Sequence, residues 1–471
     1  MKNSRCTKIV ATLGPSSNSK KMILELCAGG VDVFRLNFSH GSYEDHQAAI
    51  CSIREAEKAV NRPLAIMLDL QGPKIRIGTF QESPVPLKCG QKFQLDSDPT
   101  PGTNERVYFR HKEIFQSLKV GTSILMDDGK VLLQVDELFD DRIVGTIING
   151  KEIADRKGVN IPDVLLSVGA MTPKDEKDLS FGLLCGIDWV AVSFVQHADD
   201  ILAVRQRVPQ WMKIIAKIEK PAAIMNLDGI INAADGVMVA RGDLGVEVPL
   251  EQVPGLQKRI LRECHFLGKP VIVATQMLDS MIASPMPTRA EVSDVANAVF
   301  DGADAVMLSA ETASGQYPAE AVQIMDRIIN QVEKEPLYLD NIKSSTNFNA
   351  NICSPITFSI PKMVESSNIK AIATISTSGR TAAMISRERP KARIIAISPN
   401  EHTARYLSLI WGVQSLFSEI GNFANFDELS AFIQKTLLEM GSADNGDEIL
   451  IVSGAPYNAN AGINILQILT L

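Results

Sequence analysis

The sequence predicts an α/β protein built on a closed (β/α)8 TIM barrel, with an all-β lid domain inserted after the third strand and a C-terminal α/β domain. Eight short apolar runs alternate with amphipathic segments of helical period, a pattern typical of parallel strands buried on both faces. No GxGxxG or GxxxxGK[ST] pattern follows a strand, which favours a closed barrel over an open nucleotide-binding sheet.

The eight predicted strands are rich in β-branched residues and are bounded by Gly, Pro or Asp. Amphipathic stretches between them, such as YEDHQAAICSIREAEKAV, predict the helices that cover the barrel. The predicted strands lie within residues 8–14, 31–41, 64–70, 189–194, 213–219, 236–245, 269–277 and 304–312.

Two stretches interrupt this alternation and predict four segments along the chain. Short alternating strands with DDG and NG turns predict a β lid at 72–170, between barrel segments 1–71 and 171–345. Thr172 is placed to cap the helix that resumes the barrel. A polar, linker-like stretch precedes residues 346–471, which return to strand–helix alternation and predict a small regulatory domain.

Composition restricts the function classes. A net charge of -8 argues against nucleic acid or a membrane surface as a general partner. The seven cysteines are scattered without CxxC spacing, which indicates reduced thiols and a cytoplasmic protein. The first residues contain no apolar signal core, and no apolar run approaches membrane length. Histidine metal motifs and a Ser-His-Asp arrangement are also missing from the sequence.

Polar residues stand at the carboxyl end of each predicted strand, where active sites of barrel enzymes are found. One such residue is ordinarily a loop boundary, but this many charges of both signs predict a catalytic mouth. The residues are Thr12, Arg35, Asn37, Ser39, Asp69, Ser193, Lys217, Glu219, Arg241, Asp243, Thr275 and Glu311.

The residue types at this mouth favour metal-assisted chemistry on an anionic substrate. Glu219 and Asp243 end adjacent strands and suit either Mg²⁺ binding or acid–base work. Arg35, Lys217 and Arg241 suit a phosphorylated acid better than a neutral sugar, which favours phosphoryl transfer. Two alternatives stay open. One is a barrel lyase or aldolase using a Schiff base on the lysine, and the other is a sensor without turnover.

A series of motifs in fixed order resembles the pyruvate kinase family over essentially the whole chain. The motifs are RLNFSHG, GPKIR, KGVN, KIE, MVARGDLGVE, TQMLDSM, PTRAEVSDVANAVFDGADAVMLSAETASGQYP and SGRT. The resemblance implies transfer of the phosphoryl group of phosphoenolpyruvate to ADP, giving pyruvate and ATP in the last step of glycolysis. It also implies an allosteric homotetramer.

The resemblance assigns a role to each matching residue. Glu219 and Asp243 match ligands of Mg²⁺ or Mn²⁺, and Lys217 matches the lysine that stabilises the transferring phosphoryl group. Arg35 matches a phosphate contact, and Thr275 lies on the proposed proton route to the enolate. The substrate-binding set is Arg35, Lys217, Gly242, Asp243 and Thr275, and the nucleotide-binding set is Arg76, Lys157, Asn37 and His40.

One departure from the family pattern concerns the monovalent cation. Asn37, Ser39, Asp69 and the Leu70 carbonyl match its ligands, yet Lys74 replaces the glutamate that accompanies the ion in potassium-dependent members. A fixed ammonium group can take over the electrostatic role of that ion. We therefore predict that K⁺ is not required.

A second anion site is predicted in the last domain, where hydroxyl side chains and a glycine precede a helix. It matches the family's allosteric site and contains a single arginine. We predict a phosphorylated effector, with AMP or ribose 5-phosphate favoured over fructose 1,6-bisphosphate. The site residues are Ser376, Thr377, Ser378, Gly379, Arg380 and Thr381.

Overall fold

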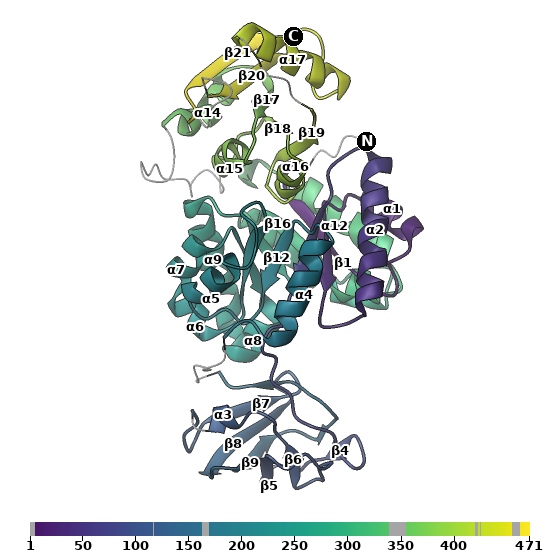
Figure 1. Cartoon of the computed structure of the whole chain (residues 1–471), viewed down its shortest axis with the longest axis vertical. Coiled ribbons are helices and arrows are strands. Elements are labelled where there is room, and N and C mark those ends of the chain that lie inside the picture. The colour runs from purple at the N-terminus through teal and green to yellow at the C-terminus, as the bar shows by residue number, and fades with distance from the viewer. Residues whose placement is uncertain are drawn as a thin grey trace.

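The computed structural model of the chain describes residues 5–115, 117–162, 169–338, 355–419, 423, 425–454 and 462–471 (Figure 1). The predicted boundary at 345/346, Cys353 and most of the terminal SGAPYNANAG segment lie outside these residues. Among the described residues, no helix is both long enough and apolar enough to cross a membrane.

Eight parallel strands close into a barrel in the order β1-β16-β15-β14-β13-β12-β3-β2, which confirms the predicted fold. Predicted strands 236–245 and 304–312 are too long, because helices begin at Arg241 and Ala310. The strands are β1 (Lys8–Leu13), β2 (Val33–Asn37), β3 (Ala65–Asp69), β12 (Trp189–Val192), β13 (Lys213–Ile218), β14 (Gly236–Ala240), β15 (Val271–Ala274) and β16 (Ala305–Leu308).

Helices surround the barrel strands, and capping boxes at Ser42, Thr172 and Thr288 begin α2, α4 and α10. The cap predicted at Thr172 is therefore confirmed. The helices are α1 (Lys20–Gly29), α2 (Tyr43–Val60), α4 (Pro173–Leu184), α5 (Ala198–Arg205), α6 (Pro221–Met225), α7 (Leu227–Ala233), α8 (Arg241–Glu247), α9 (Val253–Leu267), α10 (Arg289–Phe300), α11 (Ala310–Ala313) and α12 (Pro318–Val332).

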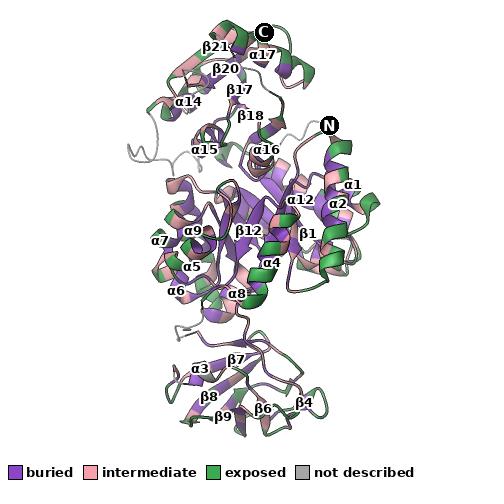
Figure 2. Cartoon of the chain, viewed as in Figure 1, coloured by how far each residue is buried: buried purple, intermediate pink, exposed green. Residues whose placement is uncertain are grey.

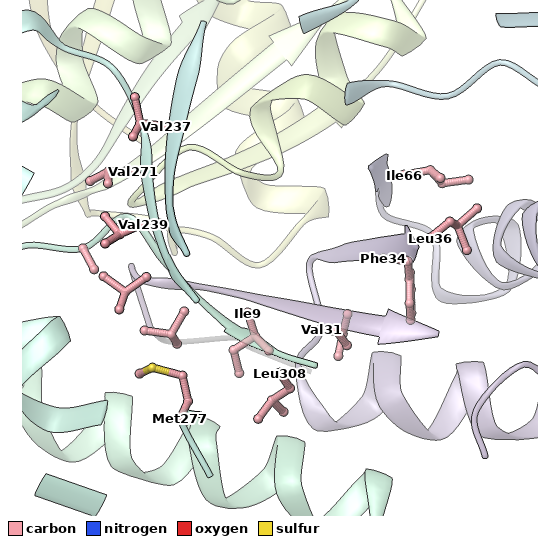
Figure 3. Packing of buried hydrophobic residues seen from close by; sticks show 14 of the residues in the cluster. Ile9, Val31, Phe34, Leu36, Ile66, Val237, Val239, Val271, Met277 and Leu308 are labelled. Carbon is pink, nitrogen blue, oxygen red and sulfur yellow. The ribbon is translucent and has the colours of Figure 1, made fainter. Parts of the chain in front are cut away.

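The barrel core has two apolar layers, because neighbouring side chains on a strand point to opposite faces. One layer lies between strands and helices and includes Phe34, Val237 and Val239, which Figure 3 shows. The other fills the barrel itself and includes Val33 and Met238. Figure 2 shows this continuous burial along the strands.

A separate sheet follows β3, and its strands alternate buried and solvent-facing residues around a core of their own. Six strands are ordered β11-β7-β8-β9-β5-β6, and β4 pairs with β10. The DDG turn forms with Asp127, Asp128 and Gly129 at positive φ. The elements are β4 (Val85–Pro86), β5 (Lys92–Asp96), β6 (Arg106–Tyr108), α3 (Lys112–Phe115), β7 (Ser123–Met126), β8 (Val131–Leu138), β9 (Arg142–Asn149), β10 (Glu152–Ile153) and β11 (Val159–Asn160).

The last part of the chain folds as a five-stranded sheet of order β19-β18-β17-β20-β21 with helices around it. Four strands are parallel, and β21 runs antiparallel to β20. The elements are α14 (Pro355–Ser366), β17 (Ile369–Ile375), α15 (Arg380–Arg387), β18 (Arg393–Ser398), α16 (Glu401–Leu407), β19 (Val413–Phe417), α17 (Phe426–Glu439), β20 (Glu448–Ser453) and β21 (Ile465–Thr470).

This last domain closes the amino-terminal end of the barrel, opposite the lid (Figure 1). Leu409 and Tyr406 pack into the apolar cluster inside the barrel, and the Tyr406 ring centroid lies 5.4 Å from that of Trp189. Arg405 on α16 pairs with Glu57 on α2 at 2.9 Å. The carboxyl-terminal mouth is at the opposite end, on the side of the lid (Figure 1).

Candidate active site

Lys217 is the buried cation at the centre of the mouth. Its ammonium group lies 2.7 Å from Ser193 Oγ, 2.8 Å from Glu219 Oε1 and 3.2 Å from Asp69 Oδ1. Burial disfavours its charge, but the carboxylates of Asp69 and Glu219 outweigh that effect and raise the pKa of Lys217. A lysine held charged in this way is suited to neutralise a phosphoryl group and poorly suited to attack a carbonyl.

Asp69 is buried between two cations. Its Oδ2 accepts a 2.6 Å hydrogen bond from Arg35 Nε, while Oδ1 faces Lys217. Burial opposes ionisation, but Lys217 and Arg35 lower the pKa of the Asp69 carboxyl. Arg35 also donates to Thr12 Oγ1 at 3.0 Å. Asp69 thereby holds both cations at the end of β3, with the Arg35 side chain partly exposed to the mouth.

Glu219 and Asp243 are the two carboxylates available for a divalent metal. Oε2 of Glu219 accepts from Phe194 N at 2.8 Å, whereas Oε1, though close to Lys217, makes no hydrogen bond of good geometry. Burial and the nearby Asp243 raise the pKa of Glu219, with Lys217 opposing. A metal ion would offset this unfavourable burial of charge.

The donor set fits Mg²⁺ with open coordination positions. Across the described ranges, no group of three or more His, Cys, Asp or Glu side chains could enclose a metal ion. Mg²⁺ is commonly held by one or two carboxylates together with oxygens of the substrate phosphate. The Glu219 and Asp243 pair meets that requirement and would leave positions for substrate.

Ser193 links several residues of the mouth, although the sequence analysis identified it only as a polar residue at a strand end. Its hydroxyl donates to the Leu70 carbonyl at 2.7 Å and accepts from the Lys217 ammonium group at 2.7 Å. The hydroxyl is buried, so both bonds restrict the lysine to one position. Its place at the end of β12, next to β13, was the only sequence signal for this function.

Thr275 and Gly242 meet across the ends of β15 and β14. Gly242 N donates to Thr275 Oγ1 at 2.8 Å, and that hydroxyl donates to the Ala274 carbonyl at 2.6 Å. Gly242 lies in the first turn of α8, beside Asp243. The predicted carboxylate contacts are therefore neighbours of the predicted metal ligand.

Arg241 does not extend into the mouth as a third cation for the substrate, contrary to the sequence-based expectation. Its guanidinium group donates to Asp294 Oδ1 and to the Thr275 carbonyl, each at 2.7 Å. Glu311 is similarly occupied, since it accepts backbone hydrogen bonds from Leu278 and Ser309. A strand-end position indicates where a side chain begins, but not which way it turns.

The residues predicted to bind nucleotide or a monovalent ion are spread along two sides of the mouth. On the lid side, Lys157 pairs with Asp127 at 2.8 Å and Arg76 donates to the Arg156 carbonyl at 2.9 Å. On the barrel side, Ser39 N donates to Asn37 Oδ1, and the His40 carbonyl contacts His46 Nε2. Arg76 and Lys157 lie on neighbouring lid segments, since Arg76 pairs with Gly158.

A small cleft separates the lid from the mouth and includes Lys74, Lys220 and Asp243 in its lining. Lys74 runs along the lid backbone, with its Cε 3.7 Å from the position a Cβ would take at Gly158. Below it, Glu247 Oε1 accepts from Lys220 Nζ at 2.6 Å and from Asn160 Nδ2 at 2.7 Å. Glu247 therefore ties the lid strand β11 to α8, a link that the sequence did not indicate.

The predicted effector loop lies between β17 and α15. Gly379 takes the left-handed N-cap position at φ 80°, and no side chain caps the first turn of α15. The Thr377 carbonyl accepts from Asn400 Nδ2 at 2.9 Å and from Thr403 Oγ1 at 2.8 Å. Loop and α16 are therefore joined, while Arg380 is exposed.

A barrel whose mouth combines a buried ammonium group with two neighbouring carboxylates, beside a lid domain, is the arrangement expected of a phosphotransferase. Two family models match the chain. The one described as pyruvate kinase, barrel domain, matches residues 4–322, and the one described as pyruvate kinase, alpha/beta domain, matches residues 355–469. The chain belongs to the pyruvate kinase family.

Individual relatives support this assignment over the full length. The pyruvate kinase of Methylorubrum extorquens is 47% identical over 99% of this chain and 98% of its own. One from Agrobacterium vitis is 44% identical over 100% and 98%. The crystal structure of a pyruvate kinase from Cryptosporidium parvum superposes with a TM-score of 0.91 at 36% identity, covering 99% of this chain and 96% of that one. The enzyme thus transfers the phosphoryl group of phosphoenolpyruvate to ADP, giving pyruvate and ATP.

Proposed function

We propose that the mouth residues divide the tasks of this reaction among themselves. Lys217 faces the transferring phosphoryl group, Arg35 binds the substrate phosphate, and the Gly242 N–H with Thr275 receives the substrate carboxylate. The observation that carries this proposal is the Lys217 ammonium group, held charged and buried between Asp69 and Glu219. Phosphoryl transfer depends mainly on such positioning and charge neutralisation.

Divalent metal is assigned to Glu219 and Asp243. Pyruvate kinases generally use Mg²⁺ and K⁺, and Mg²⁺ or Mn²⁺ held here would neutralise charge on the phosphate.

Nucleotide phosphates are assigned to Arg76 and Lys157, with Asn37 and His40 on the barrel side. Thr275 serves the proton route to the enolate. Closure of the lid over the cleft would exclude water from the phosphoryl group.

The metal assignment is tested by Glu219→Gln, with Asp228→Asn on the exposed face of α7 as the matched control. We expect Glu219→Gln to raise the Mg²⁺ concentration for half-maximal activity at least about tenfold and to lower kcat about 100-fold. Removal of metal with a chelator should abolish activity of the unaltered enzyme. An unchanged Mg²⁺ requirement in Glu219→Gln would reject the assignment.

Potassium independence is assigned to Lys74. Two observations support it: the Lys74 side chain lines the cleft together with Asp243, and both carboxylate oxygens of Asp69 already face cations. We expect full activity with Mg²⁺ in potassium-free buffer, and we expect Lys74→Glu to depend on added K⁺. Many-fold activation of the unaltered enzyme by K⁺ would contradict the proposal.

A phosphorylated effector is assigned to residues Ser376–Thr381, with AMP or ribose 5-phosphate preferred. The uncapped start of α15 offers free N–H groups, and only one arginine lies in the loop. Activation should be measured across these metabolites and fructose 1,6-bisphosphate, with Arg380→Gln as the site variant. Response to fructose 1,6-bisphosphate alone would overturn the preference.

We further propose that the enzyme is a homotetramer in the cytoplasm. Light scattering after size exclusion can test the oligomeric state.

A further inference from the structure

Two successive residues at the end of β15 have left-handed backbone conformations. Thr275 has φ 70° and Gln276 has φ 54°, although neither is glycine. This region is especially unfavourable for a β-branched side chain such as threonine. Strain of this kind persists at active sites only where surrounding contacts enforce it.

Arg241 provides most of these contacts. Its Nη2 donates to the Thr275 carbonyl at 2.7 Å, and its Nε donates to the Ala274 carbonyl at 3.3 Å. Nη1 donates to Asp294 Oδ1 on α10 at 2.7 Å, and the arginine side chain is only 12% exposed. A planar guanidinium fork can hold two adjacent carbonyls and a carboxylate at once.

The other side of Thr275 is held by the same helical turn. Gly242 N, which follows Arg241 directly, donates to Thr275 Oγ1, and the hydroxyl donates to the Ala274 carbonyl. The start of α8 therefore fixes both the backbone and the hydroxyl of Thr275. These Arg241 contacts instead tie the ends of β14 and β15 to α10.

We propose that Arg241 is a positioning residue, which holds Thr275 where its hydroxyl serves protonation of the enolate. This inference rests on the proposed function of Thr275. In that step a C–H bond forms at C3 of the enolate as an O–H bond of the hydroxyl or its bound water breaks, and solvent water restores the lost proton. Phosphoryl transfer at Lys217 lies outside the Arg241 contacts and does not need them.

The test separates the two half-reactions. Proton transfer is measured by NMR as deuterium exchange of the pyruvate methyl group in D₂O with Mg²⁺ and ATP. Phosphoryl transfer is measured as ATP formation from phosphoenolpyruvate and ADP. We expect Arg241→Lys and Thr275→Ala each to slow exchange about 10- to 100-fold, and we expect Arg241→Lys to slow ATP formation less than about threefold.

A double-mutant cycle then decides whether Arg241 acts through Thr275. In the Thr275→Ala background, adding Arg241→Lys should slow exchange by no more than about twofold. Full additivity would overturn the inference, as would a rise in KM for phosphoenolpyruvate that makes Arg241 a substrate contact. Normal exchange in Thr275→Ala alone would instead reject the proposed function of Thr275.

Two further variants distinguish a specific effect on Thr275 from a general loss of structure. Asp294→Asn weakens the ion pair with Arg241 and leaves Thr275 unchanged. We expect it to slow exchange, but by a smaller factor than Arg241→Lys does. Arg262→Lys, on the exposed face of α9, is the matched control and should leave both activities unchanged. Equal loss of both activities in Asp294→Asn would indicate a merely structural role and overturn the inference.

Discussion

His265 is a buried neutral group at the joint between the barrel and the last domain. Its Nε2 lies 2.9 Å from the Arg387 carbonyl, so the ring nitrogen donates a hydrogen bond across the joint. Burial, reinforced by Arg389, lowers the pKa of His265 to about 3. The folded protein therefore binds no proton there until strongly acidic pH, whereas the unfolded chain binds one near pH 6.5.

The stability contributed by His265 is present above about pH 6.5 and is lost as the pH falls towards 3, because the unfolded state binds more protons in that range. We expect this group alone to lower the free energy of unfolding by about 2 kcal/mol between pH 8 and pH 5. Urea titrations at both pH values measure the change. In His265→Gln, which keeps a donor but cannot ionise, that part of the loss should disappear.

His197→Gln provides the control, because His197 is exposed on the barrel surface. It should retain the full acid sensitivity of the unaltered protein. If the free energy of unfolding depended on pH identically in His265→Gln and in the unaltered protein, protonation of His265 would not contribute to the loss of stability in acid.

Single residues also show what the sequence could and could not reveal about the site. Lys217, Glu219 and Asp69 were identified because each ends a buried strand, and parallel strands bring such ends together. Arg241 was misread because the same rule says nothing about its partner Asp294, which lies on α10 and far away in sequence. The positive φ of Thr275 likewise arises from tertiary contacts.

Among the structural elements, the turn that leads from β3 into the lid depends on Gly72. It has φ 67°, and an added Cβ would lie 2.9 Å from the Phe194 ring and 3.0 Å from Ser193 Cβ. Gly90, in the lid, has φ 86° with nothing within 4 Å of the same position. The two glycines therefore share the backbone penalty and differ in steric contact.

We expect Gly72→Ala to destabilise the protein by about 2 kcal/mol more than Gly90→Ala, since only the former overpacks its surroundings. It should also reduce activity, because Ser193 positions Lys217. Urea unfolding and kcat for the two variants measure these effects. Equal destabilisation by Gly72→Ala and Gly90→Ala would mean that the Phe194 ring moves away from the added Cβ without an energetic cost.

The lid is joined to the barrel through Glu247, which accepts hydrogen bonds from Asn160 and Lys220. We expect Asn160→Ala to loosen the lid and raise KM for ADP about three- to tenfold, because the nucleotide must then order the lid itself. Steady-state kinetics measure KM, and hydrogen exchange measures the opening of β11. Asn149→Ala, at an exposed end of β9, should change neither quantity.

On the scale of the whole molecule, the barrel core is completed by a residue from another domain. Leu409 is fully buried in the cluster inside the barrel. We expect Leu409→Ala to cost about 2–5 kcal/mol and to increase exchange in the barrel strands as well as in the last domain. Leu438→Ala, at a 39% exposed position on α17, should cost under about 1 kcal/mol. Confinement of the increase to the last domain would contradict this shared core.

The parts of the fold that depend on local sequence pattern and on the number of strands could be predicted from the sequence. Eight apolar runs gave the closed barrel, and the DDG turn identified a hairpin of the lid. The pattern could not show that β5 and β6 pair in parallel, or that Leu409 fills the barrel, because both depend on contacts between distant segments. Domain boundaries remain predictions from composition.

The burial of Leu409 within the barrel also bears on how the chain matures on the ribosome. Translation adds about 5–20 residues per second, so roughly 20–80 s separate β1 from the residue that completes its core. Until β16 (Ala305–Leu308) has been made, β1 lacks this neighbouring strand as well. The first strands, which are largely buried in the folded barrel, must therefore be shielded by other means until Leu409 emerges. Slow codons before the last domain would extend that exposed interval.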